Sequence, residues 1–259
     1  SYATKQRNLN MANQSYVIYD GPSQIDGKPI VAIAQVGTGN RKTGNGMVQT
    51  WILRSDIDPI SASRTGEDSS ICGDCPHKGK PSDKASGWAI GRSCYVNLLF
   101  APNGVYKAYK RGSYPVAQGH DAIRAIGLGM GVRLGSYGDP EAIPEHVWRS
   151  LTSAAEYVTA YTHGANTMPD IVMTSADSAA QAHDAWGKGE RTFRVISALD
   201  KVIKGKEILC PASEEAKAAS GKTVTCAMCK LCGGNSVKAK SVAIVAHGAS
   251  KRTTKGLVE

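Results

Sequence analysis

The sequence contains no long hydrophobic run and few aromatic residues. No segment approaches the roughly 18–20 consecutive apolar residues of a membrane-spanning helix, and aromatic residues make up only 6% of the 259. The first ten residues, SYATKQRNLN, are polar and carry no hydrophobic signal segment. Tracts of a few residue types, which are typical of disordered chains, are also missing. We therefore expect a folded, cytoplasmic protein with no membrane partner.

Acidic residues are in deficit, with 22 Asp and Glu against 31 Lys and Arg and a formal net charge of +9. The surplus of Lys and Arg is densest after residue 200. Such a balance favours an anionic partner, such as DNA, a nucleotide or another phosphorylated ligand. A solvated Lys-rich face is the other interpretation. Charge alone therefore assigns no function, and the sequence assigns no oligomeric state.

Short apolar runs alternate with segments of helical spacing after residue 46, which predicts an α/β fold with parallel strands. Single α/β barrels commonly run to roughly 200–250 residues, so we expect a full or partial (β/α) barrel over residues 47–259. A flat, doubly wound sheet is the alternative. Residues 1–46 are expected to contribute a β-hairpin, from runs 16–20 and 29–37, as a cover or edge. The predicted strands are 48–54, 94–100, 131–138, 156–164, 170–177, 192–198, 206–211 and 241–248, and the predicted helices are 120–129, 144–157 and 177–189.

Polar side chains mark the ends of these predicted strands. Ligands of parallel α/β proteins bind where the carboxyl ends of the strands meet, so we expect Asp139, His163 and Asp177 to be catalytic. A helix N-cap is the structural alternative for Asp177. The full set is Arg54, Asn97, Gly138, Asp139, Thr162, His163, Ser175, Asp177, Arg194 and His247.

Four cysteines gather near the carboxyl end, in a Cys-rich loop expected over 210–235. Two successive C-x-x-C spacings can close around one Zn²⁺ or one 4Fe-4S cluster, and the run C-x-x-C-x-x-C resembles bacterial ferredoxin spacing, which favours iron. Free thiols are the remaining possibility. The predicted ligands are Cys210, Cys226, Cys229 and Cys232.

The other three cysteines form a second predicted metal site. Cys72 and Cys75 are another C-x-x-C, and Cys94 begins a predicted strand. Three thiolates can hold a 4Fe-4S cluster with one open iron, or bind Zn²⁺ with His77 as fourth ligand. Cys94 could instead be a buried core thiol.

The order of these motifs resembles the radical S-adenosylmethionine (radical SAM) enzymes. SYGDPEAIP, at 136–144, looks like that family's Gly-Glu-Pro element, and YTHG, at 161–164, looks like its Thr-Asn-Gly strand end. The resemblance implies a 4Fe-4S cluster on the first three cysteines and bound S-adenosylmethionine near Gly138, Asp139 and Thr162. It also implies that the carboxyl-terminal cysteines hold an auxiliary cluster.

The chain departs from that family in its cysteine spacing, because the usual C-x-x-x-C-x-x-C is absent. Locally, the segments CGDCP, CYVN, VRLGSYGDP, YTHG and RTFRV are similar to a family of phage and plasmid proteins known by a gene-product number. That similarity implies a context of mobile DNA and a place in the cytoplasm of a host cell.

The leading hypothesis is an iron–sulfur enzyme that modifies a nucleotide, a nucleic-acid base or another anionic substrate. Arg133, Arg191 and Arg194 would bind its phosphate or carboxylate, unless they form ordinary salt bridges.

Two alternatives remain. One is a zinc enzyme resembling the transglycosylases that exchange a (7-deaza)guanine base in DNA, with Asp139 and Asp177 as its paired carboxylates. The other is a metal-stapled nucleic-acid-binding module without catalysis.

Overall fold

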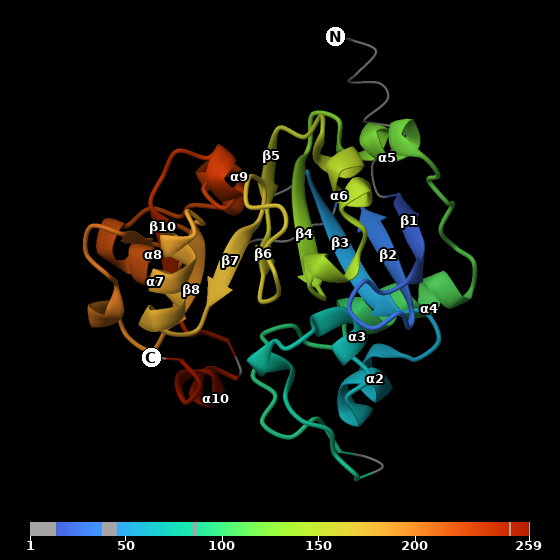
Figure 1. Cartoon of the computed structure of the whole chain (residues 1–259), viewed down its shortest axis with the longest axis horizontal. Coiled ribbons are helices and arrows are strands. Elements are labelled where there is room, and N and C mark those ends of the chain that lie inside the picture. The colour runs from blue at the N-terminus through green and yellow to red at the C-terminus, as the bar shows by residue number, and fades with distance from the viewer. Residues whose placement is uncertain (1–13, 38–45, 85–86, 249, 259) are drawn as a thin grey trace.

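A computed structural model describes residues 14–37, 46–84, 87–248 and 250–258, and these form an α/β structure with two five-stranded sheets. Figure 1 shows the sheets side by side. The first is mixed, in the order β1-β2-β3-β4-β5, and the second is parallel throughout, in the order β6-β7-β8-β10-β9. Their strands are β1 Ser15–Pro22, β2 Pro29–Gln35, β3 Met47–Arg54, β4 Gly131–Tyr137, β5 Tyr157–Thr159, β6 Tyr161–Thr162, β7 Met173–Ala176, β8 Thr192–Ile196, β9 Glu207–Leu209 and β10 Ser241–Val245.

Short helices connect the strands, and the three predicted from helical spacing are confirmed as α5, α6 and α7. Helix α6 buries Val147, Trp148 and Leu151, which lie on one face at helical spacing. Among the described residues, no helix is long and apolar enough to cross a membrane. The α-helices are α2 Pro59–Thr65, α3 Ser69–Cys72, α4 Ala101–Lys110, α5 His120–Gly127, α6 Glu145–Thr152, α7 Ala179–Gly187, α8 Glu214–Ser220, α9 Cys226–Cys229 and α10 Lys251–Lys255, with 3-10 turns at η1 Pro76–Lys78, η2 Pro140–Ala142, η3 Leu199–Lys201 and η4 Gly234–Ser236.

The expected amino-terminal hairpin is present as β1 and β2, which pair antiparallel. Strand β2 also pairs antiparallel with β3, with Ile30 opposite Arg54. The hairpin is therefore the edge of the first sheet, and its apolar residues belong to the same core as β3 and β4. Residues 1–13 and 38–45 of the predicted amino-terminal segment lie outside the described residues.

The strand predicted at 94–100 is wrong, because these residues form turns before α4. Leu98 is buried, but its neighbours Leu99 and Phe100 are 54% and 71% exposed. The backbone N–H of Cys94 donates to the carbonyl of His77 at 2.9 Å, and not to a strand. An apolar run exposed on this scale cannot be a central strand of a sheet buried on both faces.

The strand predicted at 156–164 is divided at Ala160 into β5, which pairs with β4, and β6, which pairs with β7. The N–H of Ala160 donates to Cys232 O at 3.1 Å, while its own carbonyl accepts from Met173 N at 3.0 Å. The two sheets thus meet at a single residue that is hydrogen-bonded on both sides.

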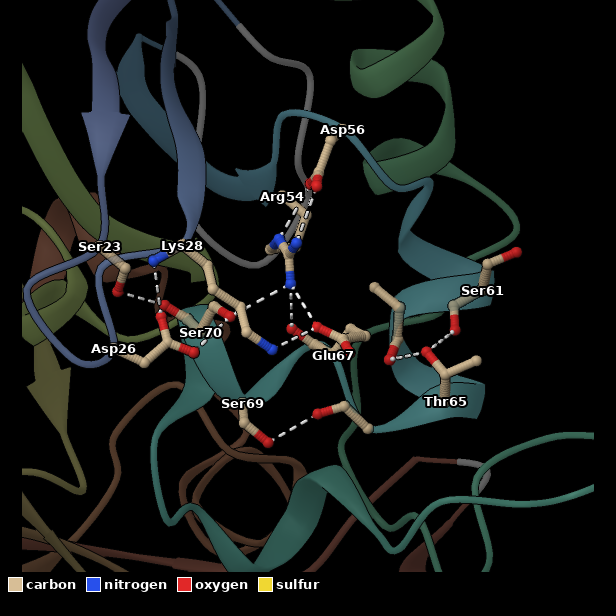
Figure 2. A network of polar contacts seen from close by, with 12 residues as sticks. Ser23, Asp26, Lys28, Arg54, Asp56, Ser61, Thr65, Glu67, Ser69 and Ser70 are labelled. Carbon is tan, nitrogen blue, oxygen red and sulfur yellow. Dashed lines mark hydrogen bonds and ion pairs between the residues drawn. The ribbon is translucent and has the colours of Figure 1, made fainter.

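A buried arginine fixes the segment that leads into α3. Arg54, at the end of β3, is 5% exposed. Its guanidinium donates to Asp56 at 3.0 and 2.8 Å and to Glu67 at 2.6 Å (Figure 2). It also lies 3.3 Å from Ser70 Oγ, inside α3. These bonds hold α3, and with it Cys72, at the carboxyl end of β3.

We expect Arg54→Ala to lower the free energy of unfolding by about 2 kcal/mol, because a buried cation is lost while its partners Asp56 and Glu67 stay partly hydrated. The matched control is Arg149→Ala, which removes two ion pairs from a side chain that is 40% exposed and should cost about 0.5 kcal/mol. Urea unfolding midpoints measure both. Equal losses would show that the network around Arg54 carries no special stability.

Candidate functional site

A cavity of about 540 Å³ lies at the carboxyl ends of the parallel strands. Its wall includes Asp139 after β4, His163 after β6, Asp177 after β7 and His247 after β10. The expectation that polar strand ends converge is therefore confirmed for these four residues. A larger hollow of about 890 Å³ along β1, α5 and α6 contains none of the cysteines or predicted site residues.

All seven cysteines line the 540 Å³ cavity. Burial raises the pKa of the Cys72 thiol well above its usual value, and Asp68, Cys75 and Cys94 raise it further. Burial likewise raises the pKa of Cys232 to about 12, against a hydrogen bond with Tyr161 that lowers it. The other thiols that raise the Cys232 pKa are Cys210, Cys226 and Cys229. The thiols that raise the Cys72 pKa thus belong to the predicted group of three, and those that raise the Cys232 pKa belong to the predicted group of four.

Tight turns deliver the first group of cysteines. Cys72 ends α3, and the N–H of Cys75 donates to its carbonyl at 3.1 Å. Pro76 then begins η1, whose His77 carbonyl accepts from the N–H of Cys94 at 2.9 Å. Cys94 lies on a turn segment and does not begin a strand; the residue is half-buried, and burial raises the pKa of its thiol.

The second group is delivered by one turn of helix and a chain reversal. Helix α9 begins after Thr225, whose hydroxyl accepts from Met228 N, and ends at Cys229; the C-cap Lys230 has a left-handed φ of 54°. This reversal turns the chain toward Cys232, whose carbonyl is bound by Ala160. The segment 210–235 is thus not a plain loop, since it also contains α8.

Asp139 joins the ends of β4 and β6. Its carboxylate accepts from Thr162 Oγ1 at 2.6 Å, from His163 N at 2.8 Å and from Glu141 N at 3.1 Å. Burial raises the pKa of Asp139, and the bonds from Thr162 and His163 oppose that rise. Gly138 beside it has a φ of +84°, in the left-handed region that favours glycine. The predicted cofactor residues Gly138, Asp139 and Thr162 therefore lie together.

Two histidines flank the carboxylate of Asp177. His77 Nε2 lies 2.9 Å from Asp177 Oδ1, and His163 Nε2 lies 3.3 Å from Asp177 Oδ2. Burial raises the pKa of Asp177, but the two histidines outweigh it and hold that pKa well below its usual value. The N-cap of α7 is Ser178, so the structural alternative for Asp177 is wrong. The contact between His77 and Asp177 spans 100 residues and has no sequence signal.

The three predicted anion-binding arginines lie in different places. Arg133 lines the cavity, hydrogen-bonds the Tyr95 hydroxyl and lies 5.9 Å from its ring centroid. Arg191 donates to the carbonyls of Gly234 and Lys240, both at 2.7 Å, and so braces the loop before β10. The structure does not bring Arg191 to the cavity.

Arg194 is also bound within the protein and does not line the cavity. It is 1% exposed and donates to both carboxylate oxygens of Glu207, at 2.8 and 2.7 Å. This bidentate pair links β8 to the start of β9. For Arg194, the alternative of an ordinary salt bridge is therefore the one that the structure contains.

Sequence reasoning missed the aromatic and apolar part of the wall. Tyr161 hydrogen-bonds Cys232 and packs against Phe193 at a tilt, with ring centroids 4.2 Å apart. Val195 and Ile244 also line the cavity from β8 and β10. The alternating pattern of polar and apolar residues in β8 could have identified Phe193 and Val195 as facing one side of the sheet.

The wall therefore combines thiols, imidazoles, two carboxylates and one arginine with an apolar surface, which is a donor set for metals and an anionic ligand. A scan against protein-family models gives no match, and searches of curated proteins and of solved structures give none either.

Proposed function

We propose that the protein is an iron–sulfur enzyme, similar in chemistry to the radical SAM enzymes, that modifies a nucleotide, a nucleic-acid base or another anionic substrate. The observation that carries this proposal is that all seven cysteines, which the sequence spaces as three and four, line one cavity. The proposal includes the fold. The parallel strands of the two sheets, which meet at Ala160, would together form one partial (β/α) barrel.

Among the described residues, no three cysteine sulfurs lie as close together as a single zinc ion requires. Zn–S bonds of about 2.3 Å in a tetrahedron bring sulfurs to about 3.8 Å from one another. No three cysteine sulfurs of the described residues lie within 4.8 Å of one another, whereas donor atoms of His77, His163 and Asp177 do. A cubane suits wider spacing because each cysteine binds a different iron.

The two groups suit different roles. Cys72, Cys75 and Cys94 would leave one iron of a 4Fe-4S cluster open, next to Asp139 and Gly138. With S-adenosylmethionine bound, a reduced cluster of this kind supplies a carbon-centred radical. Asp139 Oδ2 accepts one described hydrogen bond, from His163 N, and keeps capacity for the amino group of that cofactor.

The remaining wall fits an anionic, partly apolar substrate. Arg133 provides a guanidinium for a phosphate or carboxylate, and Phe193, Val195 and Ile244 exclude water from the reacting centre. Tyr95, at the cavity wall, is 60% exposed and could stack on a base. The net charge of +9 favours the approach of a polyanion.

The test is the metal content of the full chain purified without oxygen. We expect about eight iron and eight sulfide per chain if both groups hold a cubane, and reductive cleavage of S-adenosylmethionine by the reduced protein. Zinc in place of iron would overturn the proposal and favour the transglycosylase. Iron without cofactor cleavage would assign the clusters a structural role. Nucleic-acid binding with neither would favour the binding module.

A further inference from the structure

We propose that His77, His163 and Asp177 form a mononuclear site for a divalent transition-metal ion, beside the first cysteine group. Among the described residues they are the one set of three His, Cys, Asp or Glu side chains whose donor atoms lie within 4.8 Å of one another. Two histidines and one carboxylate are a ligand set used for Zn²⁺ and for non-haem Fe²⁺. The inference goes beyond the proposed function and does not depend on it.

One of the two distances to Asp177 equals the spacing that one ion requires, and the other is shorter, at a hydrogen-bond length. Metal bonds of about 2.0–2.1 Å to nitrogen or oxygen place neighbouring donors about 3.3 Å apart in a tetrahedron. His163 Nε2 lies 3.3 Å from Asp177 Oδ2, and His77 Nε2 lies 2.9 Å from Asp177 Oδ1. His163 Nε2 is buried and makes no well-aimed hydrogen bond to any described residue, although the ring also interacts with the Cys75 thiol.

The surroundings orient the ligands. Ser93 Oγ lies 2.7 Å from His77 Nδ1, so the hydroxyl can accept the Nδ1 proton and leave Nε2 as the free donor atom. The backbone N–H of His163 donates to Asp139 at 2.8 Å, and the backbone N–H of Asp177 donates to Gln181 Oε1 at 2.7 Å. Each ligand is thus fixed by a neighbour outside the site.

The site opens onto the cavity, since all three ligands contribute to its wall. Asp177 is 7% exposed and His77 is 9% exposed, so an ion here would be shielded from bulk solvent on the protein side. Three protein ligands leave a coordination position for water or substrate on the cavity side. A hydrogen-bonded His–Asp–His relay without a metal is the competing explanation of the same geometry.

The test is Zn²⁺ binding to the full chain as purified without oxygen, by equilibrium dialysis and metal analysis, with iron counted in the same samples. We expect wild type to bind one Zn²⁺ per chain more than Asp177→Asn or His163→Gln. Ser93→Ala should weaken Zn²⁺ binding about tenfold. His183→Gln, at an exposed histidine on α7, is the matched control and should bind like wild type.

Co²⁺ separates this site from the thiols, because sulfur ligands give intense charge-transfer absorption that nitrogen and oxygen ligands lack. We expect weak visible bands that Asp177→Asn removes. If all variants bind as much Zn²⁺ as wild type, the metal site is wrong and the relay is correct. If a variant fails to fold, wild type is tested with a chelator instead. We then expect the chelator to release one Zn²⁺ and lower the thermal midpoint, and Zn²⁺ addition to restore that midpoint. Iron content tests the proposed function independently.

Discussion

Replacing Cys72 with alanine is expected to remove about half of the iron and all of the catalytic activity. Cys72 belongs to the group of three thiols, and with only Cys75 and Cys94 left that group can no longer hold a cubane. The carboxyl-terminal group is untouched, so its share of about four iron should remain. Iron and sulfide analysis of anaerobically purified protein measures the loss, and S-adenosylmethionine cleavage measures the activity.

Cys229→Ala is the complementary change, and should remove the other half of the iron. Each variant has a control on a neighbouring exposed residue: Asp74→Asn between Cys72 and Cys75, and Met228→Ala, 67% exposed, beside Cys229. Both controls should retain full iron. If Cys72→Ala and Cys229→Ala each abolish all iron, the seven cysteines serve one centre, and their division into three and four is wrong.

Much of the fold was predictable because parallel strands buried on both faces are apolar throughout. Strands β3 and β10 are buried at every position, and both were predicted from short, largely apolar runs. The run 94–100 has the same composition yet forms turns, since its burial depends on neighbours that composition does not reveal. The division of 156–164 at Ala160 also depends on contacts with distant residues, Cys232 and Met173.

The candidate site was predictable to the extent that topology brings strand ends together. Asp139, His163 and Asp177 follow parallel strands, and they line one cavity. The partners of these groups were not predictable. His77 reaches Asp177 across 100 residues, and Arg194 is neutralised by Glu207 inside the second sheet. Residue type marks a group as able to bind an anion, but only the three-dimensional contact decides whether a protein carboxylate has already taken that role.

Gly138→Ala is expected to lower the free energy of unfolding by about 3 kcal/mol or more and to reduce iron binding at the first cysteine group. Gly138 has a φ of +84°, which costs an L-residue about 1–2 kcal/mol. An added Cβ would also lie 2.6 Å from Ile52 Cβ and 3.3 Å from Ile71 O. Overpacking of this kind typically adds about 1–3 kcal/mol.

The clash affects the site because a backbone shift that relieves it would move residues of the site. Asp139 N donates to the Ile71 carbonyl at 2.6 Å, so a shift of Gly138 away from Ile52 moves both Asp139 and the last turn of α3 that ends at Cys72. Gly205→Ala is the control for strain alone, since Gly205 has a φ of +88° but nothing within 4 Å of its Cβ position. It should cost about 1 kcal/mol and leave iron unchanged. Urea unfolding midpoints and iron content measure both variants. If the two lose equal stability and neither loses iron, the close approach at Gly138 does not position the first cysteine group, and that group must be held by the network of Arg54 alone.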